Sequence, residues 1–105
     1  MSSFRFSILS PGGKVFEGDA DYVSAPGVMG RFGVLPHHAT MIAAVQPGLT
    51  TVRQQDVERP FFTGNGLLEV TRTEVIMLVE EGVSVESNDQ VKELVAKRAQ
   101  PASKQ

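Results

Sequence analysis

The chain of 105 residues contains no cysteine and no tryptophan, and it has one tyrosine. Without cysteine, a disulfide framework and thiolate chemistry are excluded, which is compatible with a reducing cytosol. With one tyrosine and no tryptophan, the chain has little from which to build the aromatic platform that sugar-binding proteins stack on their ligands. Two frequent classes, the disulfide-stapled secreted domain and the lectin, are therefore disfavoured.

Charge of one sign and long apolar runs are lacking as well. The formal net charge is −2, so no basic face is expected that would bind nucleic acid or an anionic membrane surface. No apolar run approaches the roughly 18 residues of a spanning helix, and direct membrane insertion is not expected. Residues 1–8 lack the charged-then-apolar pattern of a signal peptide, so we expect the chain to remain in the cytoplasm.

What is present is a series of short extended segments with turn residues between them. Residues 4–9 alternate apolar and polar side chains, and Pro11 begins a Pro-Gly-Gly turn. Strands are predicted at residues 4–9, 15–18, 21–24, 41–45 (a strand or a turn leading into one), 49–54, 58–63, 67–72, 75–80 and 83–85, with a further one allowed within 25–39. Pro60 predicts an edge position or a bulge for its strand. About ten short strands in one small domain are typical of a β-sandwich or barrel.

The periodicity changes near the C-terminus. Ser87, Asn88 and Asp89 are candidate caps, and apolar side chains then recur at helical spacing from Val91. We therefore predict a β domain over residues 1–86, followed in residues 87–105 by a single short helix and a loose tail. A helix of this length is marginal alone, so it must pack on the β domain or on a partner.

Residues 25–39 are unusual for a loop. They place Gly27, Gly30 and Gly33 three residues apart between Pro26 and Pro36, and apolar side chains fill the gaps. The prolines forbid a helix, and the glycines permit tight turns and close approach of another chain. The segment is either a short buried strand with tight ends or a docking surface.

No residue pattern predicts catalysis. His37 and His38 are adjacent, so in an extended segment they point to opposite sides and cannot both bind one metal ion without a kink. Asp19 and Asp21 share a strand face, but no general-acid partner accompanies them. Ser24 has no nucleophile elbow around it, and the glycine spacing matches neither a dinucleotide fingerprint nor a phosphate loop. We expect no catalytic residue, metal or cofactor; a free-standing binding module for a carbohydrate or peptide, and a small hydrolase, remain as alternatives.

Several segments, in order and with fitting spacing, resemble the epsilon subunit of the F-type ATP synthase. They are FSILSPGGKVFEG at 6–18, APG at 25–27, GRFGVLPHHA at 30–39, QPG at 46–48 and GNGLLEV at 64–70. The resemblance covers about residues 4–86 and implies a mainly β fold, an antiparallel sandwich of two five-stranded sheets followed here by a short α-helix. It further implies a non-catalytic central-stalk (rotor) subunit that couples the gamma subunit to the membrane c-ring during ATP synthesis.

Carried over by position, the resemblance implies two contact surfaces. The c-ring side comprises Val28, Met29, Gly30, Arg31 and Phe32. The gamma side comprises Ser10, His38, Met41, Ile42 and Ala43. The implied location is the cytoplasmic face of a bacterial inner membrane, as a peripheral part of the complex.

The chain also departs from the family pattern. His37 stands where the family usually has glycine, which puts the turn beside His38 in question. Arg31 replaces an acidic or polar residue, which suggests that its c-ring partner is acidic or neutral. Longer relatives have two C-terminal helices, of which the second blocks ATP hydrolysis and in some binds ATP. Because only residues 88–100 have helical spacing here, we expect neither an extended inhibitory brake nor ATP binding.

Overall fold

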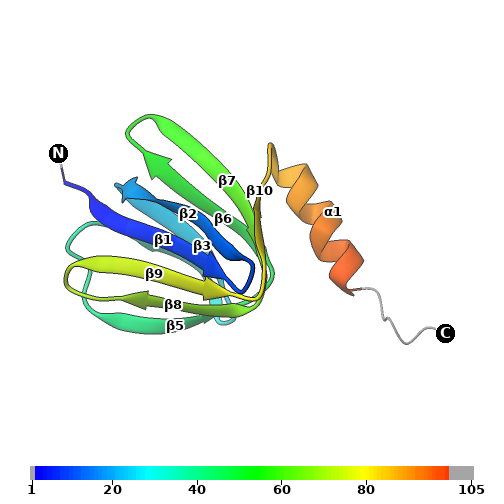
Figure 1. Ribbon diagram of the computed structural model, residues 1–105, viewed down its shortest axis with the longest axis horizontal. Helices are drawn as coiled ribbons and strands as arrows, with labels where there is room; N and C mark the ends of the chain where they lie inside the picture. The colour runs from blue at the N-terminus through cyan, green and yellow to red at the C-terminus, as the bar shows by residue number, and fades with distance from the viewer. Residues whose placement is uncertain (1, 100–105) are drawn as a thin grey trace.

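The computed structural model describes residues 2–99 and forms ten β-strands followed by one helix (Figure 1). The elements are β1 (Phe4–Ser10), β2 (Gly13–Ala20), β3 (Tyr22–Gly27), β4 (Gly30–Val34), β5 (Met41–Val45), β6 (Gly48–Gln54), β7 (Val57–Thr63), β8 (Gly66–Val70), β9 (Glu74–Val79), β10 (Gly82–Ser84) and α1 (Asn88–Ala99). The predicted fold class, a mainly β sandwich with one C-terminal helix, is confirmed. Residues 41–45 form a strand, and residues 25–39 contribute the end of β3, β4 and a loop.

The strands divide into two layers of five. One layer has the order β4-β3-β6-β7-β10 and the other the order β5-β8-β9-β1-β2. A single residue pair, Gly27 opposite Val45, joins β3 to β5 and links the layers at one corner. The expectation of antiparallel pairing throughout is wrong at one place, because β1 and β9 are parallel. Parallel neighbours need a long crossover, and here strands β2 to β8, which include four of the five strands of the other layer, lie between β1 and β9 in the chain.

The core lies between the layers and follows from the period-two alternation of the strands. Phe6 and Ile8 of β1, Val23 of β3, Val52 of β6 and Met77 of β9 are fully buried in one cluster. Since successive side chains on a strand point to opposite faces, each of these strands presents its alternate residues outward. The chemical nature of these outward side chains determines where the molecule can bind partners.

Helix α1 covers part of the outer face of β6 and β7. Its Val91 is buried with Phe62 and Val85, and Leu49, Leu94 and Val95 pack against this small cluster. Of the two predicted supports for the helix, the β domain or a partner, the structure shows the β domain. Helix α1 has 12 residues. No helix within residues 2–99 is long and apolar enough to cross a membrane. The predicted helix end at Gln100 and the tail lie outside the described residues.

Pro60 lies in the part of β7 that β10 does not pair with. The register between β6 and β7 runs without a shift past Pro60, so the alternative of a bulge is wrong there. Its neighbour β10 pairs only with residues 61–63 of β7, and the Val85 N–H donates to the Pro60 carbonyl oxygen just beyond. β7 lies between β6 and β10, so the predicted edge position is wrong for the strand as a whole, but the missing N–H of Pro60 falls beyond the segment that pairs with β10.

The sandwich has two ends, which we name for what lies at them. The hairpin end carries the connections at residues 11–12, 28–29, 46–47 and 64–65 and the end of β9. The N-terminal end carries residues 2–3, the loop at 35–40 and the turns at 55–56 and 71–73. In Figure 1 the N-terminus marks the left end, and β1 runs from it toward the hairpin end, where β10 and α1 lie.

Candidate partner-binding surfaces

The tip of the β3–β4 hairpin is the most exposed apolar point of the described chain. Gly27 pairs with Gly30, which leaves Val28 and Met29 as a two-residue turn. Met29 is 96% exposed and Val28 is 52% exposed. Gly30 has a φ of 127°, a conformation that residues with a Cβ rarely adopt. The glycine thus permits a tight turn that presents two apolar side chains to solvent.

The base of this hairpin is fixed to the rest of the sandwich. The Val28 N–H donates to the Ala44 carbonyl oxygen (3.0 Å), and the Gln46 N–H donates to the Pro26 carbonyl oxygen (2.9 Å). Phe32 of β4 is half-buried against the core. An apolar tip on a fixed base suits docking, because little conformational entropy is lost when it is covered.

Arg31 lies differently from the tip residues. Its guanidinium donates from Nη1 to the Ser24 hydroxyl (2.7 Å) and from Nη2 to the Leu49 carbonyl oxygen (2.6 Å). The side chain therefore lies across the outer face of the layer that contains β3 and β6. Of the predicted c-ring set, the structure places Val28 and Met29 at the tip, and Arg31 and Phe32 on opposite faces of β4.

A second apolar surface covers the outside of the other layer, and we call it the apolar face. It consists of Leu9, Ile42, Ala44, Leu67, Ile76 and Leu78. Ile42 is 69% exposed, Leu67 48% and Leu78 49%. Leu67 lies opposite Leu78, which lies opposite Leu9, so three leucines cross β8, β9 and β1 in one row. Glu69 interrupts the second row, between Ile42 and Ile76.

The structure separates the residues predicted for the gamma side. Ile42 points outward on the apolar face, whereas Met41 packs against the core and Ala43 alternates with Ile42 toward the same interior side. Ser10 ends β1 at the hairpin end, and His38 lies in the loop at the N-terminal end. The five residues therefore span the full length of one layer, and Ile42 is the one that the apolar face contains.

The leucines and Ile76 were missed by reasoning from the sequence, although a signal was present. Leu67 and Leu68 are adjacent, and residues 75–79 are apolar at five successive positions. A strand that is apolar at every position has two apolar faces, and only one of them can face the core of a two-layer sandwich. The other must face solvent or a partner.

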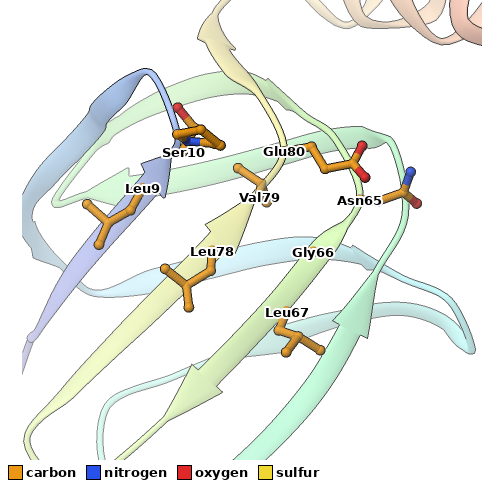
Figure 2. Close-up of a pocket in the computed structure, with 9 residues that line it drawn as sticks. Leu9, Ser10, Asn65, Gly66, Leu67, Leu78, Val79 and Glu80 are labelled. Carbon is orange, nitrogen blue, oxygen red and sulfur yellow. The ribbon is translucent and has the colours of Figure 1, made fainter.

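A pocket of about 530 Å³ opens where the apolar face meets the hairpin end. Its lining consists of Leu9, Ser10, Pro11, Asn65, Gly66, Leu67, Leu78, Val79 and Glu80. Figure 2 shows Leu9, Leu78 and Leu67 along one side and Glu80 with Asn65 on the other. Gly66 contributes no side chain, and a Cβ there would lie 1.9 Å from the Leu78 carbonyl oxygen. Gly66 therefore leaves its part of the pocket lining without a side chain.

The two histidines form part of a turn. His37 has a φ of 66°, the left-handed region, at the position where the resemblance leads one to expect glycine. His38 donates from its backbone N–H to the Leu35 carbonyl oxygen and from Nδ1–H to the Ala39 carbonyl oxygen (2.8 Å). Within residues 2–99, no group of three or more potential metal ligands gathers. The turn keeps its left-handed shape despite the side chain at His37, at some cost in strain.

The carboxylates considered for hydrolysis take part in ordinary surface pairs. Asp21 accepts from Arg53 Nε (3.2 Å) and from the Gln55 N–H (3.0 Å). Asp19 lies 3.7 Å from an Arg5 nitrogen. The Ser24 hydroxyl accepts a hydrogen bond from Arg31, as described above. These contacts stabilise strand pairs and turns.

One carboxylate has a clearly perturbed pKa. Glu17 accepts a hydrogen bond from Lys14 and pairs with Arg5, which together hold the pKa of Glu17 below its ordinary value of 4.5. The residue is exposed on the edge strand β2, so this perturbation reflects a surface ion pair rather than a reactive site.

Comparisons with known proteins agree with this architecture. Residues 3–85 match the family model described as ATP synthase, Delta/Epsilon chain, beta-sandwich domain. The chain is 37% identical over 89 residues to an ATP synthase epsilon chain of Nitrobacter winogradskyi, which covers 85% of this chain and 66% of the relative. It is 38% identical over 85 residues to that of Maricaulis maris, covering 81% and 64%. The chain thus spans about two thirds of the length of these relatives.

Solved structures share the fold. A chain of the Euglena gracilis mitochondrial ATP synthase superposes with a TM-score of 0.76 at 16% identity, over 100% of this chain and 69% of that one. One from the central stalk and c-ring of the Tetrahymena thermophila enzyme gives 0.71 at 14% identity, over 97% and 77%. With the matched sandwich and the identities to named epsilon chains, this chain belongs to the ATP synthase delta/epsilon family, as an epsilon-type member.

Proposed function

We propose that the chain is a non-catalytic rotor subunit of an F-type ATP synthase, which couples the gamma subunit to the c-ring during proton-driven ATP synthesis. The observation that carries the proposal is the apolar face, a solvent-exposed sheet surface in a chain of the epsilon family. Contiguous exposed apolar side chains on a globular protein mark an interaction surface. A sandwich with hydrogen-bonded strands is stiff, as an element that transmits torque must be.

We assign the apolar face to the gamma subunit. Ile42 and the row of leucines lie on one flat sheet surface, which offers a large area for a rigid partner. Of the predicted gamma set, Ile42 lies on this surface, and Ser10 borders the pocket at its hairpin end. His38 would contact gamma only if the partner also reached the loop at the N-terminal end.

We assign the tip of the β3–β4 hairpin to the c-ring. Val28 and Met29 project from the sandwich and are held at a fixed base, so they suit insertion among the loops of a neighbouring ring. Arg31 follows the tip in the chain, but its guanidinium is bonded to Ser24 and Leu49 on the outer face of the layer, so we assign it no contact with the ring. The subunit would then be peripheral, at the cytoplasmic face of a bacterial inner membrane, with neither ATP nor nucleic acid as a ligand.

The test is co-purification with each partner separately. The wild-type chain is expected to retain both the gamma subunit and the c-ring of the same synthase. A variant with Val28→Asp and Met29→Asp is expected to lose the ring and keep gamma, because the charges are added at the hairpin tip while Ile42 and the row of leucines assigned to gamma are unchanged. A variant with Val57→Asp, which adds one charge at an exposed position on β7, is the control and should keep both.

Failure of the wild-type chain to retain either partner would overturn the proposal. So would turnover of a small molecule by the purified chain alone, which would favour the hydrolase. Retention of the ring by the doubly charged tip variant would overturn the assignment of the tip while leaving the rotor role in place.

A further inference from the structure

Glu69 is the acidic residue that interrupts the apolar face. On β8 it lies opposite Ile42 of β5 on one side and opposite Ile76 of β9 on the other. Leu67, two positions earlier on β8, belongs to the row of leucines and lies about 7 Å away at the usual rise of an extended chain. Glu69 is exposed, so water hydrates its carboxylate in the isolated chain. A flat partner that covers Ile42 and Leu67 also covers Glu69.

No basic side chain within residues 2–99 pairs with Glu69. Its carboxylate takes part in no hydrogen bond or ion pair among these residues. The strands of this layer carry two basic residues, Arg5 and Lys14, and both are engaged at the β1–β2 side. Arg5 lies 3.3 Å from Glu17 and 3.7 Å from Asp19, and Lys14 pairs with Glu17. The apolar face therefore carries an uncompensated negative charge at Glu69.

A hollow of about 370 Å³ lies beside Glu69, where the apolar face meets the N-terminal end of the sandwich. Ile42, Glu69 and Arg72 are among the residues that line it. Arg72 is exposed in the turn after β8 and forms no ion pair with Glu69. The hollow gives a long side chain of a partner room beside the Glu69 carboxylate.

The chemistry of this region limits what can cover it. A wholly apolar surface would suit Ile42 and the leucines, but it would remove water from the Glu69 carboxylate without replacing its hydrogen bonds, which is costly. A second copy of the same face would offer aliphatic side chains and another Glu69, because Arg5 and Lys14 are already paired. A long basic side chain meets both demands, because its methylene stem covers apolar surface while its charged head pairs with a carboxylate.

We propose that Glu69 pairs with a lysine or arginine of the gamma subunit, whose stem lies across Ile42. This inference rests on the proposed function, because it assumes that gamma covers the apolar face. The basic head on gamma then lies about 7 Å from the apolar groups that cover the row of leucines. The leucines supply area, whereas Glu69 fixes the register of gamma along β8 and rejects a partner surface that is wholly apolar.

The test is the affinity of the full chain for purified gamma of the same synthase, measured by biolayer interferometry at ionic strengths of about 0.05 and 0.5 M. Glu69→Gln keeps the size of the side chain and removes its charge. We expect it to weaken binding about tenfold at low salt and less at high salt, because a cation of gamma loses its counter-charge. Glu69→Leu replaces the carboxylate with apolar area, and we expect it to weaken binding about 30-fold, because the cation is then covered without an acceptor.

Two variants serve as controls. Glu58→Gln removes the same charge from an exposed position on β7 in the opposite layer, so it controls for net charge and should bind as the wild type does. Arg72→Gln should also bind as the wild type does, because Arg72 is not the partner of Glu69. Thermal unfolding of each variant checks that the fold is intact.

Four outcomes would overturn the inference. If the wild-type chain binds gamma and either Glu69 variant binds as tightly or more tightly, the basic partner is wrong while the rotor function stands. If Arg72→Gln weakens binding as much as Glu69→Gln does, the carboxylate pairs within the chain. If the isolated chain self-associates and Glu69→Gln abolishes that, a second copy covers the face in place of gamma. If the wild type does not bind gamma, the proposed function falls and this inference falls with it.

Discussion

Replacement of Ile42 by serine tests the apolar face most directly. Ile42 lies outward on β5 and is 69% exposed in the isolated chain. Burying an isoleucine side chain fully is worth about 1.5–3 kcal/mol, so covering the exposed part of this one would contribute about 1–2 kcal/mol to binding. Ile42→Ser removes that contribution, and we expect the affinity for gamma to fall about 5- to 30-fold.

The assay has two parts, because binding and folding must be separated. Isothermal titration of gamma into the chain gives the affinity, and urea unfolding of the isolated chain gives the free energy of unfolding. Since most of Ile42 is already in water, its replacement should change the free energy of unfolding by less than about 0.5 kcal/mol. Val57→Ser is the matched control, because Val57 is also a β-branched residue, 52% exposed, but lies on β7 in the opposite layer.

Three results would refute the reasoning. If Ile42→Ser binds gamma as tightly as the wild type does, the apolar face is not the gamma surface. If Val57→Ser loses as much affinity as Ile42→Ser, the effect does not come from a contact on that face. A loss of affinity that appears together with a large loss of stability would likewise contradict the exposure on which the magnitude is based.

Three further predictions concern the fold itself. Thr50 and Thr63 are fully buried, and their hydroxyls share a 2.8 Å hydrogen bond. Thr50→Val or Thr63→Val alone should lower the free energy of unfolding by about 1–3 kcal/mol, because the other hydroxyl is left without this partner. The double variant should lose less than the sum of the two, because it leaves neither hydroxyl behind. Additive costs in urea unfolding would contradict this. His37→Gly should raise the unfolding free energy by up to about 1 kcal/mol by removing left-handed strain, and a lower stability would count against the strain. Because the folded-state pKa of Glu17 is depressed by its basic neighbours, its contribution to stability is present above the unfolded pKa near 4.5 and is lost as pH falls through the folded value. Glu17→Gln should therefore show a shallower loss of stability in acid, and parallel pH profiles for the two proteins would refute this.

The sequence determined the elements that depend on local chemistry. Alternation of apolar side chains predicted the strands, and turn residues predicted most of their ends, because these signals act over a few neighbouring residues. The change of period after Ser87 predicted the helix. Residues 25–39 were predicted to be a short buried strand with tight ends or a docking surface, and the structure places the β3–β4 hairpin there; docking at its tip stays a prediction. The family resemblance is confirmed on the same residues.

The tertiary structure alone decided which strands are neighbours and which faces are left uncovered. Nothing in residues 4–9 distinguishes a parallel from an antiparallel partner, so the pairing of β1 with β9 came from the closing of the whole sandwich. For the same reason, the apolar positions of β8 and β9 could not be divided into core and surface until the second layer was placed. Ser10 and His38, which the family resemblance groups on the gamma side, lie at opposite ends of the sandwich. Side-chain alternation is local, whereas the choice of strand partner is made between distant residues, and the proposed binding surface depends on that choice.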